Sequence, residues 1–300
     1  MVPTWRKILQ NGSSPADSKL VAISASTPAK TSLVQELHTL PLHNATALQV
    51  LSMIDDPDVS IEALGKLIQG DASLSTRILQ LANSSFFGRR TEVVAIDKAV
   101  VAIGLSTVRT FTFAAAFDLF NDKGSALPPS FHHHAVTAAA GSMVVARRLR
   151  INPSDAFSAG LIHDLGQALL YRFDSKRYDQ LLIDHPDEEE LAGVERLVYG
   201  MSHAEAAAVT LMEVRFPKLL IDAVAEHHEP VKRKRIGKPE LAAVIAVGER
   251  LGRLLLPDGS LAAIDEVPEW LSWLGIEGEA KTLMEEVQAA HQDIAGFLRL

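Results

Sequence analysis

The sequence predicts an all-α protein, and three features of its 300 residues lead to this prediction. Apolar side chains recur at steps of three and four residues from about residue 31 onward, which is the spacing of one face of an α-helix. The chain lacks convincing stretches that alternate apolar and polar residues, and it lacks a repeat of fixed period. Proline, glycine and acidic residues interrupt the apolar segments, as expected where helices begin and end.

An N-terminal helical subdomain is predicted over residues 31–125. Before it, residues 1–30 are rich in Ser, Pro and Ala and lack a periodic pattern, so we expect a tail or linker there. Ser60 is a suitable N-cap for one helix of the subdomain, and Gly104 separates its last two helices. The helices follow from apolar stripes at 47–54, 61–68, 74–82, 96–103 and 105–120.

A second helical bundle is predicted over residues 126–255, after a loop rich in turn-forming residues at 121–129. Within it, helical patterns occupy about 131–149, 154–174, 176–184, 188–199, 203–214, 217–228 and 239–255. Another break precedes a C-terminal helical extension over residues 256–300. There an apolar seam at steps of three and four comprises Leu283, Val287, Ala290, Ile294 and Phe297. One amphipathic helix packed on its own domain explains this seam, and the alternative is an oligomer contact.

Composition excludes several classes of protein. The formal net charge of −8 argues against bulk binding to nucleic acid or to an acidic membrane surface. The chain has no cysteine, which excludes disulfides, thiolate metal sites and cysteine nucleophiles. It has no apolar run near the roughly 18 residues of a membrane helix and no apolar signal core at its start. We therefore expect a soluble cytoplasmic protein without nucleic-acid or membrane partners.

Histidines gather in the second bundle, where eight of the eleven lie between residues 132 and 228. His227 continues the apolar stripe of Leu220 and Val224, and Glu249 continues a stripe that includes Ile245. Both polar side chains are therefore expected to point toward the core. Burying an unpaired carboxylate costs several kcal/mol or shifts its protonation, so Glu249 needs a partner there.

Further polar groups lie at predicted helix ends. Ser202 to Glu205 fits a capping box, which places His203 in the first turn of a helix. His163 and Asp164 stand at the end of another apolar helix. Imidazole nitrogens and carboxylate oxygens suit Fe, Mn, Zn or similar ions, so these groups favour a metal site. The alternative is a hydrogen-bonded histidine–carboxylate network that only satisfies buried polar atoms.

Several segments also carry a family resemblance. They are His134, the GLIHDLG segment at 160–166, His203-Ala-Glu, the HHEP segment at 227–230, LANSSFFG at 81–88 and AVVAIGL at 99–105. These motifs resemble the HD superfamily of metal-dependent phosphohydrolases. The arrangement from about residue 31 to 253 resembles one branch of it, the HDOD domain (HD-related output domain) of bacterial signalling proteins.

The resemblance implies a ligand set for one or two divalent ions such as Fe, Mn or Zn. In catalytic HD proteins a first His, the His-Asp pair and a late acid hold a metal that supports attack of water on a phosphoester. The corresponding positions here are His134, His163, Asp164 and Glu249. Cyclic-di-nucleotide phosphodiesterases of the superfamily add histidines for a second ion, which correspond to His203, His227 and His228.

Departures from the phosphodiesterase pattern put turnover in doubt. Gln167 stands where those enzymes usually have a lysine that could contact phosphate as a point charge. The Gly-Tyr-Pro segment is missing, and Glu249 is one methylene longer than the usual Asp. HDOD proteins are regarded as signalling modules, so we expect a bacterial signal-transduction module that acts mainly through contacts with a partner protein. The alternative is a metal-dependent phosphohydrolase that acts on a nucleotide or cyclic dinucleotide.

Two weaker expectations complete the sequence-based interpretation. Lys232 and Arg233 follow the histidine pair and could form an electrostatic lip for a phosphate-bearing ligand. The alternative is a solvated loop. His132, His133 and His185 are expected at the surface.

Overall fold

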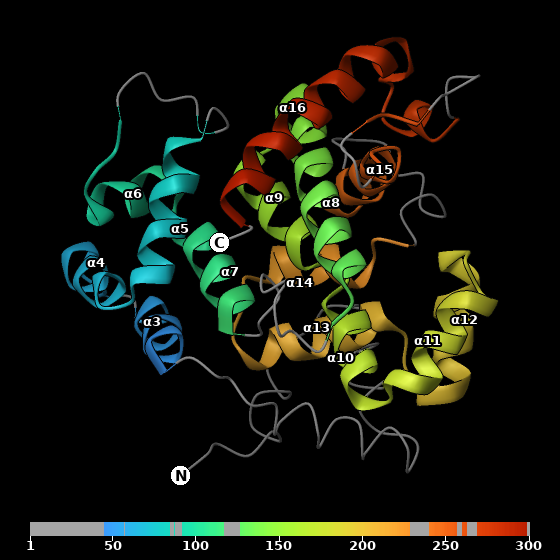
Figure 1. Ribbon diagram of the computed structural model, residues 1–300, viewed down its shortest axis with the longest axis horizontal. Helices are drawn as coiled ribbons and strands as arrows, with labels where there is room; N and C mark the ends of the chain where they lie inside the picture. Colours follow the sequence, from blue (N-terminus) through green and yellow to red (C-terminus); the bar gives the residue numbers. More distant parts are fainter. Residues whose placement is uncertain are drawn as a thin grey trace.

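The computed structural model describes residues 45–56, 58–84, 87, 92–116, 127–228, 240–256, 260–262 and 269–298. The predicted tail over residues 1–30 lies outside this part. In the described residues every regular element is a helix, apart from one isolated antiparallel bridge between Leu255 and Leu261. The all-α prediction is therefore confirmed. Figure 1 shows a smaller group of helices, α3 to α7, beside a larger group that starts with α8. The exact domain boundaries stay predictions.

The smaller group is built from short helices with the expected caps. The Ser60 and Asp71 side chains accept hydrogen bonds from backbone N–H groups in the first turns of α4 and α5. Gly104 lies between α6 and α7 with a φ of 81°, a left-handed conformation that favours glycine. The helices are α3 (Ala45–Ile54), α4 (Ile61–Gln69), α5 (Ala72–Asn83), α6 (Ile96–Ile103) and α7 (Leu105–Ala116).

A buried arginine joins the two groups of helices. Arg109 of α7 donates to the Asp55 carboxylate after α3 at 2.6 Å and to the backbone carbonyl of Arg215 at 3.2 Å. Only 7% of Arg109 is exposed, so its charge depends on these acceptors.

Among the described helices no single one has the length and apolar composition to cross a membrane, although α6 and α7 pass that test jointly as a pair bent by 107°.

The larger group differs from the prediction at two points, and the first is that the helix predicted over 217–228 ends at Ala225. Second, the pattern predicted as one helix over 154–174 forms two helices, because the chain turns at His163 and Asp164. A Cβ atom at Gly166 would collide with the backbone carbonyl of His203, so the glycine lets α10 approach the start of α13. The helices are α8 (Pro129–Arg148), α9 (Pro153–Ile162), α10 (Leu165–Phe173), α11 (Ser175–Asp184), α12 (Glu188–Tyr199), α13 (His203–Glu213), α14 (Lys218–Ala225) and α15 (Leu241–Arg253).

Glycines also set the close approach of α8 and α15. A Cβ atom at Gly141 or Gly248 would overlap the backbone of the opposite helix. The two helices can therefore pack backbone to backbone, as only small residues allow. His134 of α8 and Glu249 of α15 consequently reach the same interior space.

The C-terminal part packs on this bundle. It consists of the 3-10 helices η3 (Glu269–Trp273) and η4 (Glu277–Glu279) and of α16 (Ala280–Leu298), which lies along α8. Leu283, Val287 and Ile294 of the predicted seam are fully buried within the chain, and the side chain of Phe297 lies outside the described part. The seam therefore packs on its own chain, and an oligomer formed through α16 would use the other faces of this helix.

Candidate metal centre

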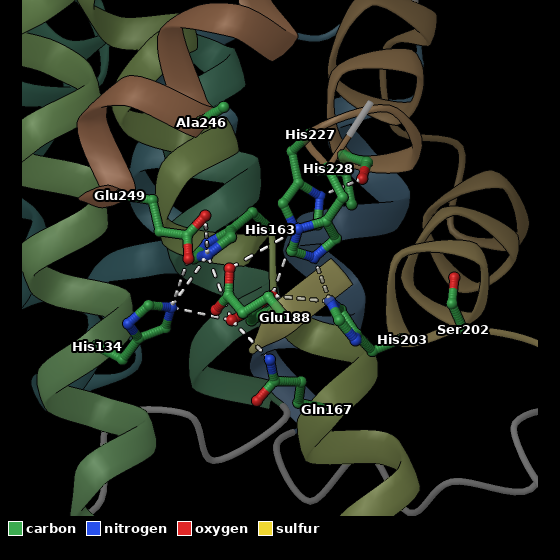
Figure 2. A network of polar contacts seen from close by, with 12 residues as sticks. His134, His163, Gln167, Glu188, Ser202, His203, His227, His228, Ala246 and Glu249 are labelled. Atoms are coloured by element: carbon green, nitrogen blue, oxygen red, sulfur yellow. Dashed lines mark hydrogen bonds and ion pairs between the residues drawn. The ribbon is translucent and has the colours of Figure 1, made fainter. Parts of the chain in front are cut away.

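All seven side chains predicted as metal ligands surround one interior space, and Figure 2 shows most of them. They are His134 of α8, His163 and Asp164 in the turn between α9 and α10, His203 at the start of α13, His227 and His228 just after α14, and Glu249 of α15. Segments far apart in the chain thus supply these groups, and helix packing brings them together.

The seven residues form two sets that share one carboxylate. The first set is His134, His163, Asp164 and Glu249, and the second is Asp164, His203, His227 and His228. Within each set the candidate ligand atoms all lie within 4.8 Å of one another. Because zinc–ligand distances are about 2.0–2.2 Å, two ligands of one ion lie up to about 4.4 Å apart. Each set is therefore close to coordinating geometry.

Asp164 stands between the two sets with one oxygen toward each. Its Oδ2 lies 2.9 Å from the Nε2 of His134 and 3.3 Å from the Nε2 of His163. Its Oδ1 lies 3.5 Å from the Nε2 of His203 and 3.5 Å from the Nε2 of His227. This carboxylate could therefore bridge two ions.

Backbone carbonyls fix the orientation of two of the rings. The Nδ1 of His163 lies 2.7 Å from the carbonyl oxygen of Gly160, and the Nδ1 of His227 lies 2.6 Å from that of Val224. A carbonyl only accepts, so each Nδ1 carries a proton, and in the neutral form of each ring the Nε2 presents a lone pair. Both lone pairs point toward Asp164, as a metal ligand requires.

A side chain that the sequence analysis did not single out holds a third ring. The buried Glu195 of α12 accepts hydrogen bonds from the backbone N–H and the Nδ1 of His203, both at 2.7 Å, and from the Tyr178 hydroxyl at 2.5 Å. Burial alone would lower the pKa of His203, but the Glu195 carboxylate raises it. Glu195 lies four residues after the buried Leu191 of the same helix. The stripe argument that identified Glu249 could therefore have found Glu195 as well.

Among the residues that the structure describes, three buried polar atoms in the centre have no hydrogen-bond partner. They are the Oδ1 of Asp164, the Nε2 of His227 and the Oε2 of Glu249. Leaving a buried acceptor unsatisfied costs about 1–3 kcal/mol, so a network that merely satisfied itself should not leave three. A divalent ion in each set would satisfy all three atoms. The donor set and its orphaned atoms therefore fit a metal centre.

The protonation states favour metal binding too. Burial lowers the pKa of His227 to about 4 and also lowers the pKa of His134. Burial alone would raise the pKa of Asp164, but the surrounding rings, His163 foremost, hold it well below its usual range. Burial, reinforced by the Asp164 carboxylate, raises the pKa of Glu249 well above its usual range. Neutral imidazoles and an ionised Asp164 are the forms that bind a metal, and Glu249 would release its proton on binding.

A cavity of about 310 Å³ opens onto the first set, at His134 and Asp164. Phe131 and Leu191 contribute apolar parts of its wall. Arg253 is the single lysine or arginine among its described lining residues. The cavity therefore combines access to the candidate ligands with apolar walls and one cationic group.

The charged and polar groups at this cavity are already paired. Arg253 forms ion pairs with Glu249, at 2.9 Å, and with Glu188. Gln167 donates its amide N–H to Oδ2 of Asp164 at 3.0 Å, so this neutral side chain contacts the centre where the phosphodiesterase pattern has a lysine. An incoming phosphate would compete with Glu188 and Glu249 for the Arg253 guanidinium.

The expected surface positions of three histidines need correction. His132 is 9% exposed, because α8 is packed against α9, α15 and α16 and most of its circumference is covered. His133 is half-buried against Leu255, and His185 is half-buried at the cavity. Lys232 and Arg233, the predicted phosphate lip, lie outside the described residues.

A helical bundle around a buried histidine–carboxylate cluster defines this protein as one of the HD type. The family model of the HDOD domain matches residues 40–230, so the chain belongs to the HDOD family. None of the curated proteins matches this chain.

Solved structures share the fold. A provisionally named phosphohydrolase from Shewanella amazonensis SB2B is 23% identical with a TM-score of 0.64, over 89% of this chain and 98% of that chain. An HDOD domain protein with unknown function from Geobacter sulfurreducens is 22% identical with a TM-score of 0.59, over 88% and 97%. A provisionally named signal transduction protein from Marinobacter aquaeolei VT8 is 18% identical with a TM-score of 0.57, over 95% and 66%.

Proposed function

We propose that this chain is a bacterial signal-transduction module of the HDOD type that acts mainly through contacts with a partner protein. We further propose that its larger helical group holds up to two divalent metal ions, with Asp164 between them. Membership of the HDOD family and the name of the similar Marinobacter protein support a signalling role. His134, His163 and Glu249 would complete the first site, and His203, His227 and His228 the second.

One observation carries this proposal: the ligand set is complete, but the single arginine among the described residues of the cavity is already held in ion pairs. Arg253 pairs with both Glu249 and Glu188, and Gln167 contributes a neutral amide. A bound divalent ion would supply Lewis acidity for phosphoester hydrolysis. Efficient hydrolysis also needs cationic groups that position the phosphate and stabilise its developing charge. The centre is therefore better suited to hold ions than to turn over a phosphoester.

Two measurements on the full chain test the proposal. Elemental analysis after reconstitution with Mn²⁺, Fe²⁺ or Zn²⁺ should find up to two ions per chain, and none at the centre of Asp164→Ala. Hydrolysis of bis(p-nitrophenyl) phosphate and of cyclic dinucleotides by the loaded protein should stay near the rate of His163→Ala. Protein that takes up no metal would contradict the centre. Rapid hydrolysis that depends on His163 and Asp164 would contradict the non-catalytic role.

A second candidate function is a metal-dependent phosphohydrolase that acts on a nucleotide or cyclic dinucleotide. The cavity of about 310 Å³ favours it, because this cavity reaches His134 and Asp164 directly. Its apolar wall at Phe131 and Leu191 could accommodate a nucleobase. This function predicts metal-dependent turnover of such a compound that His163→Ala abolishes.

A further inference from the structure

We propose that Glu195 is a positioning residue that fixes the tautomer and orientation of His203, and that it thereby determines the affinity of the second metal site only. This inference rests on the proposed metal centre. It concerns a residue of α12 that is not itself a candidate ligand.

The contacts of Glu195 leave His203 a single arrangement. Glu195 is fully buried, and its Oε2 accepts both the backbone N–H and the Nδ1–H of His203. Its Oε1 accepts the hydroxyl of the buried Tyr178, which holds the carboxylate in place from the other side. Nδ1 therefore carries the proton of the neutral ring. The Nε2 of His203 then presents a lone pair into the second set, 2.6 Å from the Nε2 of His228 and 3.5 Å from Oδ1 of Asp164.

The rings of the centre differ in what holds their Nδ1 atoms. His163 and His227 donate to backbone carbonyls, which no side-chain substitution removes. Among the three rings with an Nδ1 hydrogen bond in the described cluster, His203 alone uses a side chain. The Nδ1 of His228 lies 3.7 Å from Glu188, which is too far for a hydrogen bond.

This asymmetry predicts an effect on one ion rather than two. A carboxylate that accepts the second N–H of a ligating histidine orients the ring and raises its basicity. Substituting such a partner typically costs about 10–100-fold in metal affinity. His203 belongs only to the second set, so the first set of His134, His163, Asp164 and Glu249 should keep its affinity.

Glu195→Gln in the full chain tests this inference, with Zn²⁺ as the probe. Competition with a chelator of known affinity should show one ion bound as in the wild type and the second bound about 10–100-fold more weakly. Glu205→Gln is the matched control. Glu205 lies in the first turn of α13, as His203 does. Its carboxylate accepts a hydrogen bond from the Ser202 backbone N–H, but not from the His203 ring. A glutamine can preserve that capping contact, so this variant should bind both ions normally.

A second readout needs no metal. Long-range ¹H–¹⁵N correlation spectra of the metal-free protein report which ring nitrogen of His203 carries the proton. At a pH high enough for the ring to be neutral, the wild type should show only the Nδ1–H tautomer, and Glu195→Gln should show a mixture of tautomers. If Glu195 only stabilised the fold, Glu195→Gln would lower the unfolding temperature. It would then leave the His203 tautomer unchanged and would not weaken the binding of one ion more than that of the other.

The inference fails if Glu195→Gln binds both ions with wild-type affinity, or if it weakens both ions equally. If Glu195→Gln does not fold, Tyr178→Phe decides the question. This variant removes only the hydroxyl contact to Glu195, so it should lower the affinity for the second ion by a smaller factor than expected for Glu195→Gln. An unchanged affinity would overturn the inference. A wild type that binds no ion would contradict the proposed metal centre instead, and the tautomer spectra would then still judge the role of Glu195.

Discussion

Asp164→Asn should abolish the stabilisation that metal ions give this protein, because both ligand sets share this one residue. The carboxylate presents Oδ2 to His134 at 2.9 Å and Oδ1 to His203 at 3.5 Å. An asparagine keeps one oxygen and turns an NH₂ group toward the other set. It also removes the negative charge that offsets a divalent ion, so both sites lose affinity.

The size of the effect follows from linkage. At a free concentration 100 times its Kd, an ion that binds only the folded chain adds about 2.7 kcal/mol to the free energy of unfolding. A 300-residue chain has an unfolding entropy of about 0.6 kcal/mol/K, taken at about 2.1 cal/mol/K per residue. Each ion should therefore raise the Tm by about 4 °C, and two ions by about 9 °C.

Differential scanning fluorimetry with and without metal measures this shift, and each variant serves as its own metal-free reference. The wild type should show the full shift. His134→Ala and His228→Ala each disrupt one set and should keep about half of it. Asp164→Asn should show almost none. A wild-type shift in Asp164→Asn, or a full shift in both histidine variants, would refute the shared-carboxylate geometry.

Three further predictions concern stability. Burial lowers the pKa of His227 to about 4 from 6.5. As the pH falls, the His227 ring therefore takes up a proton in the unfolded chain before it does so in the folded chain. Urea titrations of the metal-free protein should show full stability above about pH 6.5 and a loss of about 3 kcal/mol from this ring by about pH 4; stability that rises as the pH falls through that window would contradict a buried neutral ring. In Gly252→Ala, the new Cβ would lie 2.7 Å from the backbone of Thr137, which cannot yield as a flexible side chain would. Chemical denaturation should show a loss of about 1–3 kcal/mol, and an unchanged midpoint would contradict the close approach of α8 and α15. Arg109→Met leaves Asp55 without its buried partner, so it should cost about 1.5–3 kcal/mol in the same assay. An effect below about 0.5 kcal/mol, as at ordinary surface sites, would mean that the buried contacts of Arg109 with Asp55 and with the Arg215 carbonyl add little to stability.

Local signals in the sequence suffice for most helices. The stripes after Ser60 and Asp71 carry both the apolar period and a side-chain cap, and both helices form where expected. The pair His163 and Asp164 marks a helix end in the sequence, and α9 does end there, but the apolar pattern over 154–174 does not reveal the packing of the helix that follows. That packing depends on the contact between Gly166 and the His203 backbone, which is a tertiary feature.

Local signals in the sequence likewise predict some features of the candidate site, while others depend on tertiary packing. Stripe positions and family resemblance point to the residues of the cluster. Glu249 is buried where α15 continues an apolar face, and His227 is buried although α14 ends at Ala225, two residues before it. The position of Asp164 between the two sets depends on how four helices pack, and no local pattern encodes it. Glu195 has the same helical signal as Glu249, but its role becomes visible only with the His203 ring beside it.

Anomalous diffraction from crystals of the full chain soaked in Mn²⁺ or Zn²⁺ tests the central claim most directly. The account predicts two peaks, one on each side of the Asp164 carboxylate, with His163 beside the first and His227 beside the second. Peaks confined to the protein surface, with none within coordinating distance of Asp164, would contradict it.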